Sequence, residues 1–466
     1  MDYNAAAAAY ASGASGMDGQ DSPFHPSYED RGPTAPDRMF TAVAPETIQH
    51  LILAWHEHLS RHRSPRPDVV HVHHLSHLQS SVRRAYPGHR VITTLHGTDL
   101  KLLDQAQHIS RFAARLGTPL TTLSAACAVP EHKQAILDRF LRDLDDLTDE
   151  ERALAHATDW RLWPYADLWS VQMKRYARQA GHIVVVSESD RTEVDRLLGI
   201  AGDDVTMVPN GVDTTRFVPL NLTDEQRMAH LRRWLVENPR GWAPDQDPGS
   251  ISYTEADLAR LTDDSGRLRP LLLWVGRFQK VKRLDILLRA FAAVLKTANP
   301  TPALLLWGGY PGEAEGEHPQ TTAQRLGIDR HVYFIGWRGH DELPQGLNCA
   351  DIMVAPAVNE SFGMVYIEAQ ACGTPPIATN TGGPASIITS QGESANGWTV
   401  NPDDERDLAA TLSTILTDPE EQAQRAANAV RHAHRSYSWT TAANCYQELY
   451  EELAQAEGPT PRTQAW

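Results

Sequence analysis

Short apolar runs, each followed by a loop and then by helical periodicity, recur in two series along the chain. The runs lie at 69–72, 91–94, 183–186 and 205–208 and, after a break, at 271–275, 303–307, 332–335, 352–355 and 376–379. Alternation of strand-sized apolar runs with helices is typical of a parallel sheet that is covered by helices. Two such series predict an α/β fold of two Rossmann-like domains, with a ligand cleft between them and a hinge near Asn210-Gly211.

The strongest helical pattern follows the first run of the second series. Its apolar residues recur at helical spacing and are Leu284, Leu287, Leu288, Phe291, Val294 and Leu295. A second pattern begins near Thr47 and is ended by Pro65 and Pro67. We also expect a final helix near 439–453 that packs back across the junction of the two domains.

These patterns divide the chain into five predicted parts. They are a disordered tail at 1–40, a first Rossmann-like domain at 41–215 with a helical insertion at 110–170, an inserted linker or lid at 216–269, a second Rossmann-like domain at 270–435, and a crossing helix with a tail at 436–466. The tail prediction follows from its richness in Ala, Gly, Ser, Pro and Asp.

Composition narrows the function classes. The 466 residues carry a formal net charge of -16, which argues against nucleic-acid binding. The four cysteines form no CxxC pair, and no apolar run reaches the length of a membrane span. The first residues lack the basic region of a signal peptide. We therefore expect a reduced, cytoplasmic protein without a transmembrane segment.

A glycine and two cations follow the first strand of the second series. Gly276 allows the backbone to turn, Arg277 comes next, and Lys282 lies five residues beyond the arginine at a helix start. A planar guanidinium and a point-charge ammonium suit a diphosphate. The alternative is a pair of solvated basic residues beside a helix. The pattern alone favours neither the diphosphate site nor this alternative.

Two glutamates flank the start of another predicted helix. Glu360 and Glu368 lie eight positions apart in the stretch 359–369, and Ser361 can cap a helix that starts near Phe362 and stops at Gly373. Free N–H groups at such a helix start bind anions. The alternative is a capping loop and one exposed glutamate.

A glycine pair follows the strand predicted at 376–379. Gly382 and Gly383 precede Pro384, which occupies the favoured first position of a helix. Glycines at this place allow close approach of a ligand. Taken alone, the stretch is more often an ordinary turn.

Together, these three motifs resemble the donor-binding half of the retaining glycosyltransferases of the GT-B fold. The order GRF…K, ESFGMVYIE and ACGTPPIATNTGG is similar to glycosyltransferase family four, which is related to sucrose-phosphate synthases, bacterial glycogen synthases and mannosyltransferases. The segment 209–213 with Phe217 resembles the interdomain segment of that family, and 95–99 resembles its strand-end histidine motif. The resemblance covers roughly 68–110, 180–220 and 270–450.

The resemblance implies a role for each matching residue. Arg277 and Lys282 hold the donor diphosphate after Gly276, Glu360 contacts the transferred sugar, and Glu368 binds the ribose hydroxyls. Backbone N–H groups of Ser361, Phe362, Gly363 and Met364 contact phosphate or sugar. Gly336, Trp337 and Arg338 lie near the base, and His96 lies beside the sugar. The expected catalytic residues are His96, Arg277, Lys282 and Glu360.

The resemblance further implies a metal-independent hexosyltransferase that needs no cofactor. The first domain binds an unknown hydroxyl acceptor, and the second binds the nucleotide diphosphate-sugar. Two alternatives remain open: a nucleotide-sugar epimerase of the same fold, and a nucleotide-sugar-binding subunit with weak catalysis. The second is kept because no equivalent of the family's first strand and glycine-rich loop precedes Val69.

Two other features could indicate a metal. The histidine cluster His71, His73, His74 and His77 is divided by strand alternation, which places His71 and His73 on one face and His74 on the other. The D-x-D triplets at 143–145 and 245–247 lie in polar insertions, where a solvated charge run is the better interpretation. We therefore expect no metal site.

Overall fold

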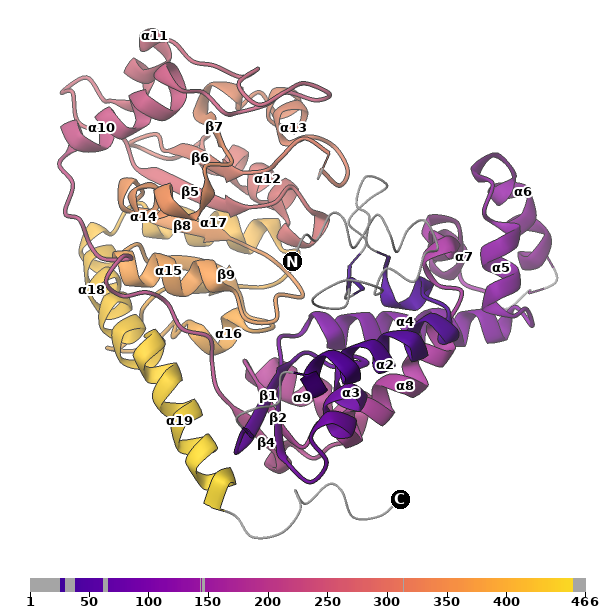
Figure 1. Cartoon of the computed structure of the whole chain (residues 1–466). Coiled ribbons are helices and arrows are strands. Elements are labelled where there is room, and N and C mark those ends of the chain that lie inside the picture. The colour runs from indigo at the N-terminus through magenta and orange to yellow at the C-terminus, as the bar shows by residue number, and fades with distance from the viewer. Residues whose placement is uncertain are drawn as a thin grey trace. The chain divides into compact units, whose positions relative to one another are not determined.

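The computed structural model describes residues 26–29, 38–61, 66–142, 144, 147–312 and 314–455. These residues form two compact units (Figure 1). Unit 1 comprises the described residues up to Val186, Asp190–Met207 and those from Glu448 onward, whereas unit 2 comprises Ser187–Ser189 and Val208–Gln447. The tail predicted at 1–40 lies for the most part outside the described residues.

The sheet of unit 1 has four parallel strands. They are β1 (Val69–His73), β2 (Arg90–Leu95), β3 (His182–Val185) and β4 (Val205–Met207), in the spatial order of the sequence. Valine, isoleucine and threonine dominate them, as expected where β-branched side chains pack on a pleated surface. All four strands predicted for the first series are therefore confirmed.

Helices precede, connect and follow the strands of this sheet (Figure 1). They are α2 (Pro45–Arg61), α3 (Leu78–Ala85), α4 (Thr98–Arg115), α5 (Leu120–Ala126), α6 (Pro130–Leu141), α7 (Asp149–Ala157), α8 (Ala166–Gln179) and α9 (Glu188–Leu198). The predicted insertion is helical because α5, α6 and α7 lie in it. Its α7 starts with a capping box between Thr148 and Glu151. The buried indole of Trp160, in the core of unit 1, donates to the Ala155 carbonyl of this helix at 3.0 Å.

The sheet of unit 2 has six parallel strands in the order β10-β9-β8-β5-β6-β7. They are β5 (Leu271–Gly276), β6 (Ala303–Gly308), β7 (Val332–Gly336), β8 (Ile352–Ala355), β9 (Pro376–Thr379) and β10 (Trp398–Val400). The five predicted strands are present, and β10 was not predicted. The strand order reverses between β5 and β8, and such a switch point opens a crevice at the carboxyl ends of the strands.

The helices of unit 2 cover both faces of its sheet. They are α10 (Asp224–Arg232), α11 (Glu255–Leu258), α12 (Leu284–Val294), α13 (Pro319–Leu326), α14 (Gly339–Cys349), α15 (Met364–Cys372), α16 (Pro384–Ile387), α17 (Glu405–Ile415) and α18 (Pro419–Ser436). The amphipathic pattern predicted from Leu284 is α12, whose Leu287, Leu288 and Phe291 are fully buried. Pro384 is the first residue of α16, as predicted.

Two segments near the unit boundaries have defined contacts. Residues 216–269 pack within unit 2, where the buried indole of Trp234 donates to Glu342 at 2.8 Å. Helix α19 (Trp439–Gln455) has its residues up to Gln447 in unit 2 and its later residues in unit 1.

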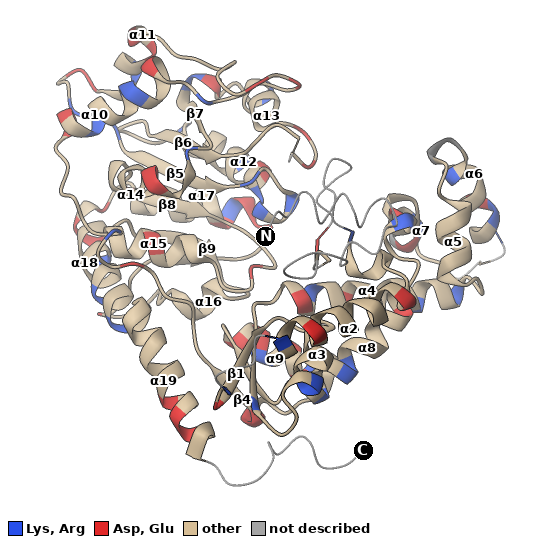
Figure 2. Cartoon of the chain, in the orientation of Figure 1, with Lys and Arg blue, Asp and Glu red and all other residues tan. Residues whose placement is uncertain are grey.

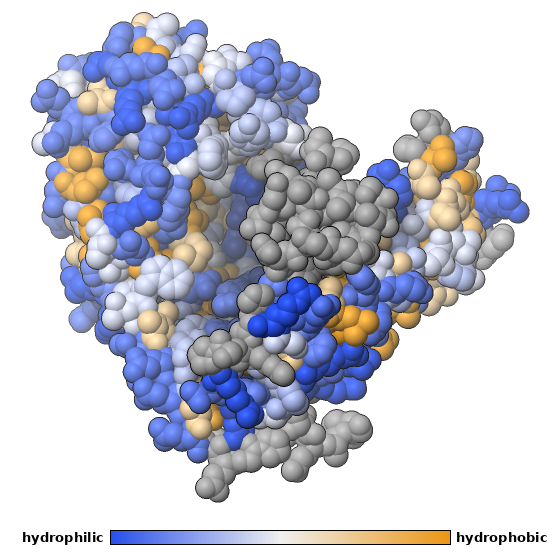
Figure 3. Space-filling model, viewed as in Figure 1, coloured by the Kyte–Doolittle hydropathy of each residue, from blue (hydrophilic) through white to orange (hydrophobic). Residues whose placement is uncertain are grey.

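The surface is predominantly polar. Acidic and basic residues are interspersed over the elements in Figure 2, and Figure 3 shows hydrophilic residues over most of the visible face with small hydrophobic patches. Within the described part of the chain, no helix combines the length and the apolar character that a bilayer span requires. The four cysteines are free thiols, and Cys127, Cys349 and Cys372 are buried.

Candidate functional site

The carboxyl end of β5 carries the first predicted motif. Gly276 ends this strand, and a Cβ at Gly308 on the neighbouring β6 would lie 2.1 Å from the Gly276 carbonyl oxygen, so the two strand ends meet backbone to backbone. Phe278 is buried, with its ring centroid 5.5 Å from that of Trp242. This anchor fixes the loop in which Arg277 lies.

The second motif meets the first across the switch point. Lys282 Nζ lies 2.6 Å from Glu360 Oε2, and both side chains are about three-quarters buried, with 26% and 23% exposed. The Val358 amide donates to the Val281 carbonyl at 2.8 Å and ties the two loops together. The structure therefore brings together a cation and a carboxylate that lie 78 residues apart in the sequence.

The glycine pair packs against the backbone of the loop that carries Glu360. The Gly383 amide donates to the Glu360 carbonyl at 2.8 Å, and a Cβ at Gly383 would lie 2.3 Å from the Ser361 carbonyl oxygen. Gly382 has φ of 68°, and a Cβ there would lie 2.6 Å from the Glu360 carbonyl oxygen. Only glycines allow this backbone packing, so the stretch is more than an ordinary turn.

The start of α15 differs from the prediction. The helix begins at Met364 rather than near Phe362, and its N-cap is Gly363 with φ of 94°, without a capping side chain. Ser361 therefore does not cap the helix. The reason is that the left-handed conformation before the helix favours glycine, whereas Phe362 is buried with its ring 5.9 Å from that of Tyr437. Gly373 ends the helix as predicted.

Glu368 lies on α15, two residues and thus about half a turn beyond Tyr366. The Tyr366 hydroxyl donates to the Ala355 carbonyl at 2.6 Å and fixes the helix to the end of β8. The carboxylate of Glu368 is buried, and its Oε1 lies 2.8 Å from His340 Nε2. Burial raises the pKa of Glu368, while the hydrogen bond from His340 and the charges of His340 and Arg216 oppose that rise. His340 was not among the predicted site residues, because no motif in the sequence marks it.

The third group of predicted residues lies at the carboxyl end of β7, whose last residue is Gly336. Gly336 has φ of 77°, Trp337 is exposed, and Arg338 is buried. Arg338 Nη2 donates to the Trp234 carbonyl at 2.7 Å and to the Asn238 carbonyl. Its Nε and Nη1 have no hydrogen-bond partner among the described residues. Burial lowers the pKa of Arg338 to about 10.

His96 lies in unit 1, at the end of β2, together with part of the histidine cluster. His96 Nε2 lies 2.8 Å from His73 Nδ1, and the rings of His71 and His73 stack at 4.5 Å. His71 also contacts the Tyr450 hydroxyl at 2.6 Å and the Thr94 hydroxyl at 2.7 Å. Burial lowers the pKa values of His71 and His96 to about 4.

No three His, Cys, Asp or Glu side chains in the described ranges are arranged to hold a metal ion. Of the two D-x-D triplets, 245–247 lies in a turn of unit 2, whereas Asp143 and Asp145 are outside the described residues.

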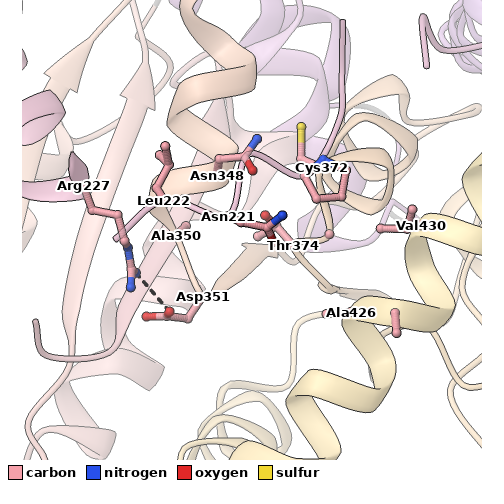
Figure 4. Close-up of a pocket in the computed structure, with 13 residues that line it drawn as sticks. Asn221, Leu222, Arg227, Asn348, Ala350, Asp351, Cys372, Thr374, Ala426 and Val430 are labelled. Carbon is pink, nitrogen blue, oxygen red and sulfur yellow. Dashed lines mark hydrogen bonds and ion pairs between the residues drawn. The ribbon is translucent and has the colours of Figure 1, made fainter. Parts of the chain in front are cut away.

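A cavity of about 380 Å³ in unit 2 lies near the amino ends of β8 and β9, at the edge opposite to the predicted motifs (Figure 4). Four of its polar side chains have partners, namely those of Arg227, Asn348, Asp351 and Thr374. Arg227 Nη2 pairs with Asp351 at 2.9 Å, and Asn348 Nδ2 donates to the Val218 and Pro344 carbonyls. Thr374 donates to the Leu347 carbonyl at 2.8 Å.

Comparison with solved structures defines the fold. Sucrose-phosphate synthase from Thermosynechococcus elongatus is similar in structure with a TM-score of 0.56 and 19% identity, over 91% of this chain and 82% of that one. Anabaena HepE in complex with UDP is similar in structure with a TM-score of 0.54 and 16% identity, over 87% of this chain and 82% of that one. The fold of this chain is the GT-B fold, and its predicted resemblance to GT-B glycosyltransferases is confirmed.

Two models of glycosyltransferase families match parts of this chain. Residues 265–432 match the model described as Glycosyl transferases group 1, and 148–216 match Glycosyltransferase Family 4. A D-inositol 3-phosphate glycosyltransferase of Salinispora arenicola is 32% identical over 298 residues, which is 61% of this chain and 59% of the relative. The chain thus spans about three-fifths of the length of that curated relative. These matches do not favour the epimerase alternative.

Proposed function

We propose that this protein is a retaining glycosyltransferase that transfers a sugar from a nucleotide diphosphate-sugar to a hydroxyl acceptor. The observation that carries the proposal is the Lys282–Glu360 pair at the switch point between β5 and β8, held by the Gly382-Gly383 backbone. It lies within the residues that match the group 1 family model.

The first step of the proposal is diphosphate binding. Arg277 and Lys282 supply the cations, and the N-terminus of the nine-residue helix α15 supplies N–H groups behind Gly363. The loops that carry these groups are held before the donor arrives, because Phe278 is buried and the glycine pair packs against the backbone of the Glu360 loop. Preorganised donors stabilise the charge that develops on a leaving group without reorganisation.

The remaining predicted residues each contact a different part of the donor in this proposal. Glu360 contacts the transferred sugar, and Glu368 accepts hydrogen bonds from the ribose hydroxyls. The segment 336–338 lies near the base, where the exposed indole of Trp337 offers a stacking surface. His96 is proposed to lie beside the sugar. Two further expectations stay predictions: the domain bounds 41–215 and 270–435, and the cytoplasmic location.

We expect retention of configuration because the motifs resemble those of the retaining GT-B glycosyltransferases. The acceptor hydroxyl attacks the anomeric carbon from the face that the diphosphate leaves, its proton passes to the donor phosphate, and the carbon–oxygen bond to the diphosphate breaks. The two glutamates then need not act as the acid and nucleophile of a glycosidase. No metal and no cofactor is needed in this scheme.

The test is a donor and acceptor screen with the purified full chain. UDP-, GDP- and ADP-sugars are supplied with myo-inositol phosphates as first acceptors, because the Salinispora relative is named for inositol 3-phosphate and HepE was solved with UDP. Transfer with retained anomeric configuration, read by NMR, supports the proposal. An inverted product excludes retention, a sugar epimer without transfer indicates an epimerase, and binding without turnover indicates a binding subunit.

A further inference from the structure

The Glu368 carboxylate is held at one of its two oxygens. Its Oε1 lies 2.8 Å from His340 Nε2, while Oε2 has no hydrogen-bond partner among the described residues. The two side chains differ in burial, since 7% of the Glu368 side chain and 56% of the His340 side chain is exposed. A buried carboxylate with one oxygen fixed and one oxygen unused has a defined direction for a second hydrogen bond.

His340 is itself held by residues of unit 2. Its ring centroid lies 5.1 Å from that of Phe217, which is buried. Beside it, Arg216 Nη2 pairs with Asp341 Oδ1 at 2.5 Å. The charge of Arg216 acts on Glu368, Asp341 pairs with Arg216, and the buried Cys372 thiol lies on the same helix as Glu368.

We propose that His340 is a positioning residue for Glu368, which occupies Oε1 and thereby directs Oε2 toward the ribose hydroxyls of the donor. This inference rests on the proposed function, because it takes the ribose role of Glu368 from there. His340 donates from Nε2, in the neutral tautomer or as the imidazolium, and the carboxylate accepts. No bond other than hydrogen bonds forms or breaks in this role.

The alternative is a purely structural hydrogen bond that stabilises unit 2. The two roles differ in one measurable quantity, the preference for a ribonucleotide over its 2′,3′-dideoxy analogue. Loss of a positioning residue weakens only the nucleotide that has the hydroxyls. Loss of a structural residue weakens both nucleotides alike.

The experiment uses the full chain and isothermal titration calorimetry. UDP, GDP and ADP are titrated first, and the tightest binder is then compared with its 2′,3′-dideoxy form. For His340→Ala we expect affinity for the ribonucleotide to fall by roughly tenfold, the size of one lost hydrogen bond to a charged group, with little change for the dideoxy form. His340→Gln should restore the preference, because its amide donor reaches the place of Nε2. His434→Ala, an exposed histidine of the same unit, is the control.

Three results separate the inference from the function on which it rests. An equal loss for both nucleotides in His340→Ala overturns the positioning role. If Glu368→Gln lowers the ribose preference and His340→Ala does not, the inference fails and the role of Glu368 stands. If Glu368→Gln leaves the preference unchanged, the ribose role fails and the inference fails with it. Should His340→Ala not fold, comparison of His340→Gln with the shorter His340→Asn decides, and an equal preference in these two variants overturns the role.

Discussion

Lys282 Nζ and Glu360 Oε2 are 2.6 Å apart, and this ion pair joins the loop after β5 to the loop after β8. Each partner compensates the charge of the other where both side chains are largely buried. In the proposed function a diphosphate binds Lys282 and a sugar binds Glu360. The donor therefore has to share or replace the contact between Lys282 and Glu360. Substitution of Lys282 and substitution of Glu360 have opposite expected effects on nucleotide binding.

Lys282→Ala is expected to weaken binding of a nucleoside diphosphate about ten- to a hundredfold. The substitution removes a charge-assisted contact, worth roughly 1.5–3 kcal/mol, and leaves Glu360 as an uncompensated negative charge near the phosphates. Titration calorimetry with UDP measures the change. Lys296→Ala, at an exposed lysine beyond α12, is the matched control. Unchanged affinity in Lys282→Ala would remove this residue from the diphosphate site.

Glu360→Gln is expected to lower turnover strongly while free nucleoside diphosphate binds as well as before or more tightly. The contact of this carboxylate belongs to the sugar during transfer, and its loss frees Lys282 for phosphate. Steady-state kinetics and calorimetry on the same sample separate the two effects. The exposed Glu393→Gln is the control. Nearly normal turnover together with weaker nucleotide binding would show that the division of roles is wrong.

The sequence predicted the parallel strands well because their apolar runs are local signals. It missed β10, because the run of strand-forming residues there ends at Asn401 after three residues, whereas the run at 205–208 has four. It also placed the start of α15 two residues early, because the left-handed Gly363 before that helix is a property of the loop. His340 could not be predicted, since it meets Glu368 across 28 residues and only through tertiary packing of α14 beside α15.

Gly383→Ala is expected to destabilise the protein by about 1–3 kcal/mol, since the added Cβ would lie 2.3 Å from the Ser361 carbonyl oxygen and 2.5 Å from Phe362 Cα. Backbone atoms cannot rotate away, so the Glu360 loop has to shift. Thermal unfolding measures the loss, and nucleotide affinity should fall with it. In the control Gly202→Ala the new Cβ meets only Arg191 side-chain atoms, at 3.4 Å or beyond. Equal melting temperatures for the two variants would contradict this account of the glycine pair.

Nucleotide affinity is expected to fall on acidification at a pH above 4.5. The ribose hydroxyls need Glu368 as an ionised acceptor, and burial raises the pKa of this carboxyl above its ordinary value of 4.5. His340 opposes that rise, so His340→Ala should move the acid limb to still higher pH. The phosphates titrate as well, and the curve of Glu368→Gln is therefore subtracted. Identical pH profiles for the wild-type protein and Glu368→Gln would exclude a titrating role for this residue.

His71 and His96 are expected to make unit 1 less stable as the pH falls. Burial lowers their pKa values from 6.5 to about 4, so between these values the unfolded chain takes up protons that the folded chain does not. The stability that both neutral rings contribute is complete above pH 6.5 and is lost as the pH falls toward about 4. Each substitution, His71→Gln or His96→Gln, should make the dependence of melting temperature on pH shallower over this range, whatever it does to stability at pH 7. The exposed His434→Gln should leave the slope unchanged. A steeper or unaltered slope in both His71→Gln and His96→Gln would contradict this prediction, because it would mean that the two rings take up protons in the folded state as well. Direct titration of their ring signals by NMR would then give pKa values near 6.5 rather than near 4.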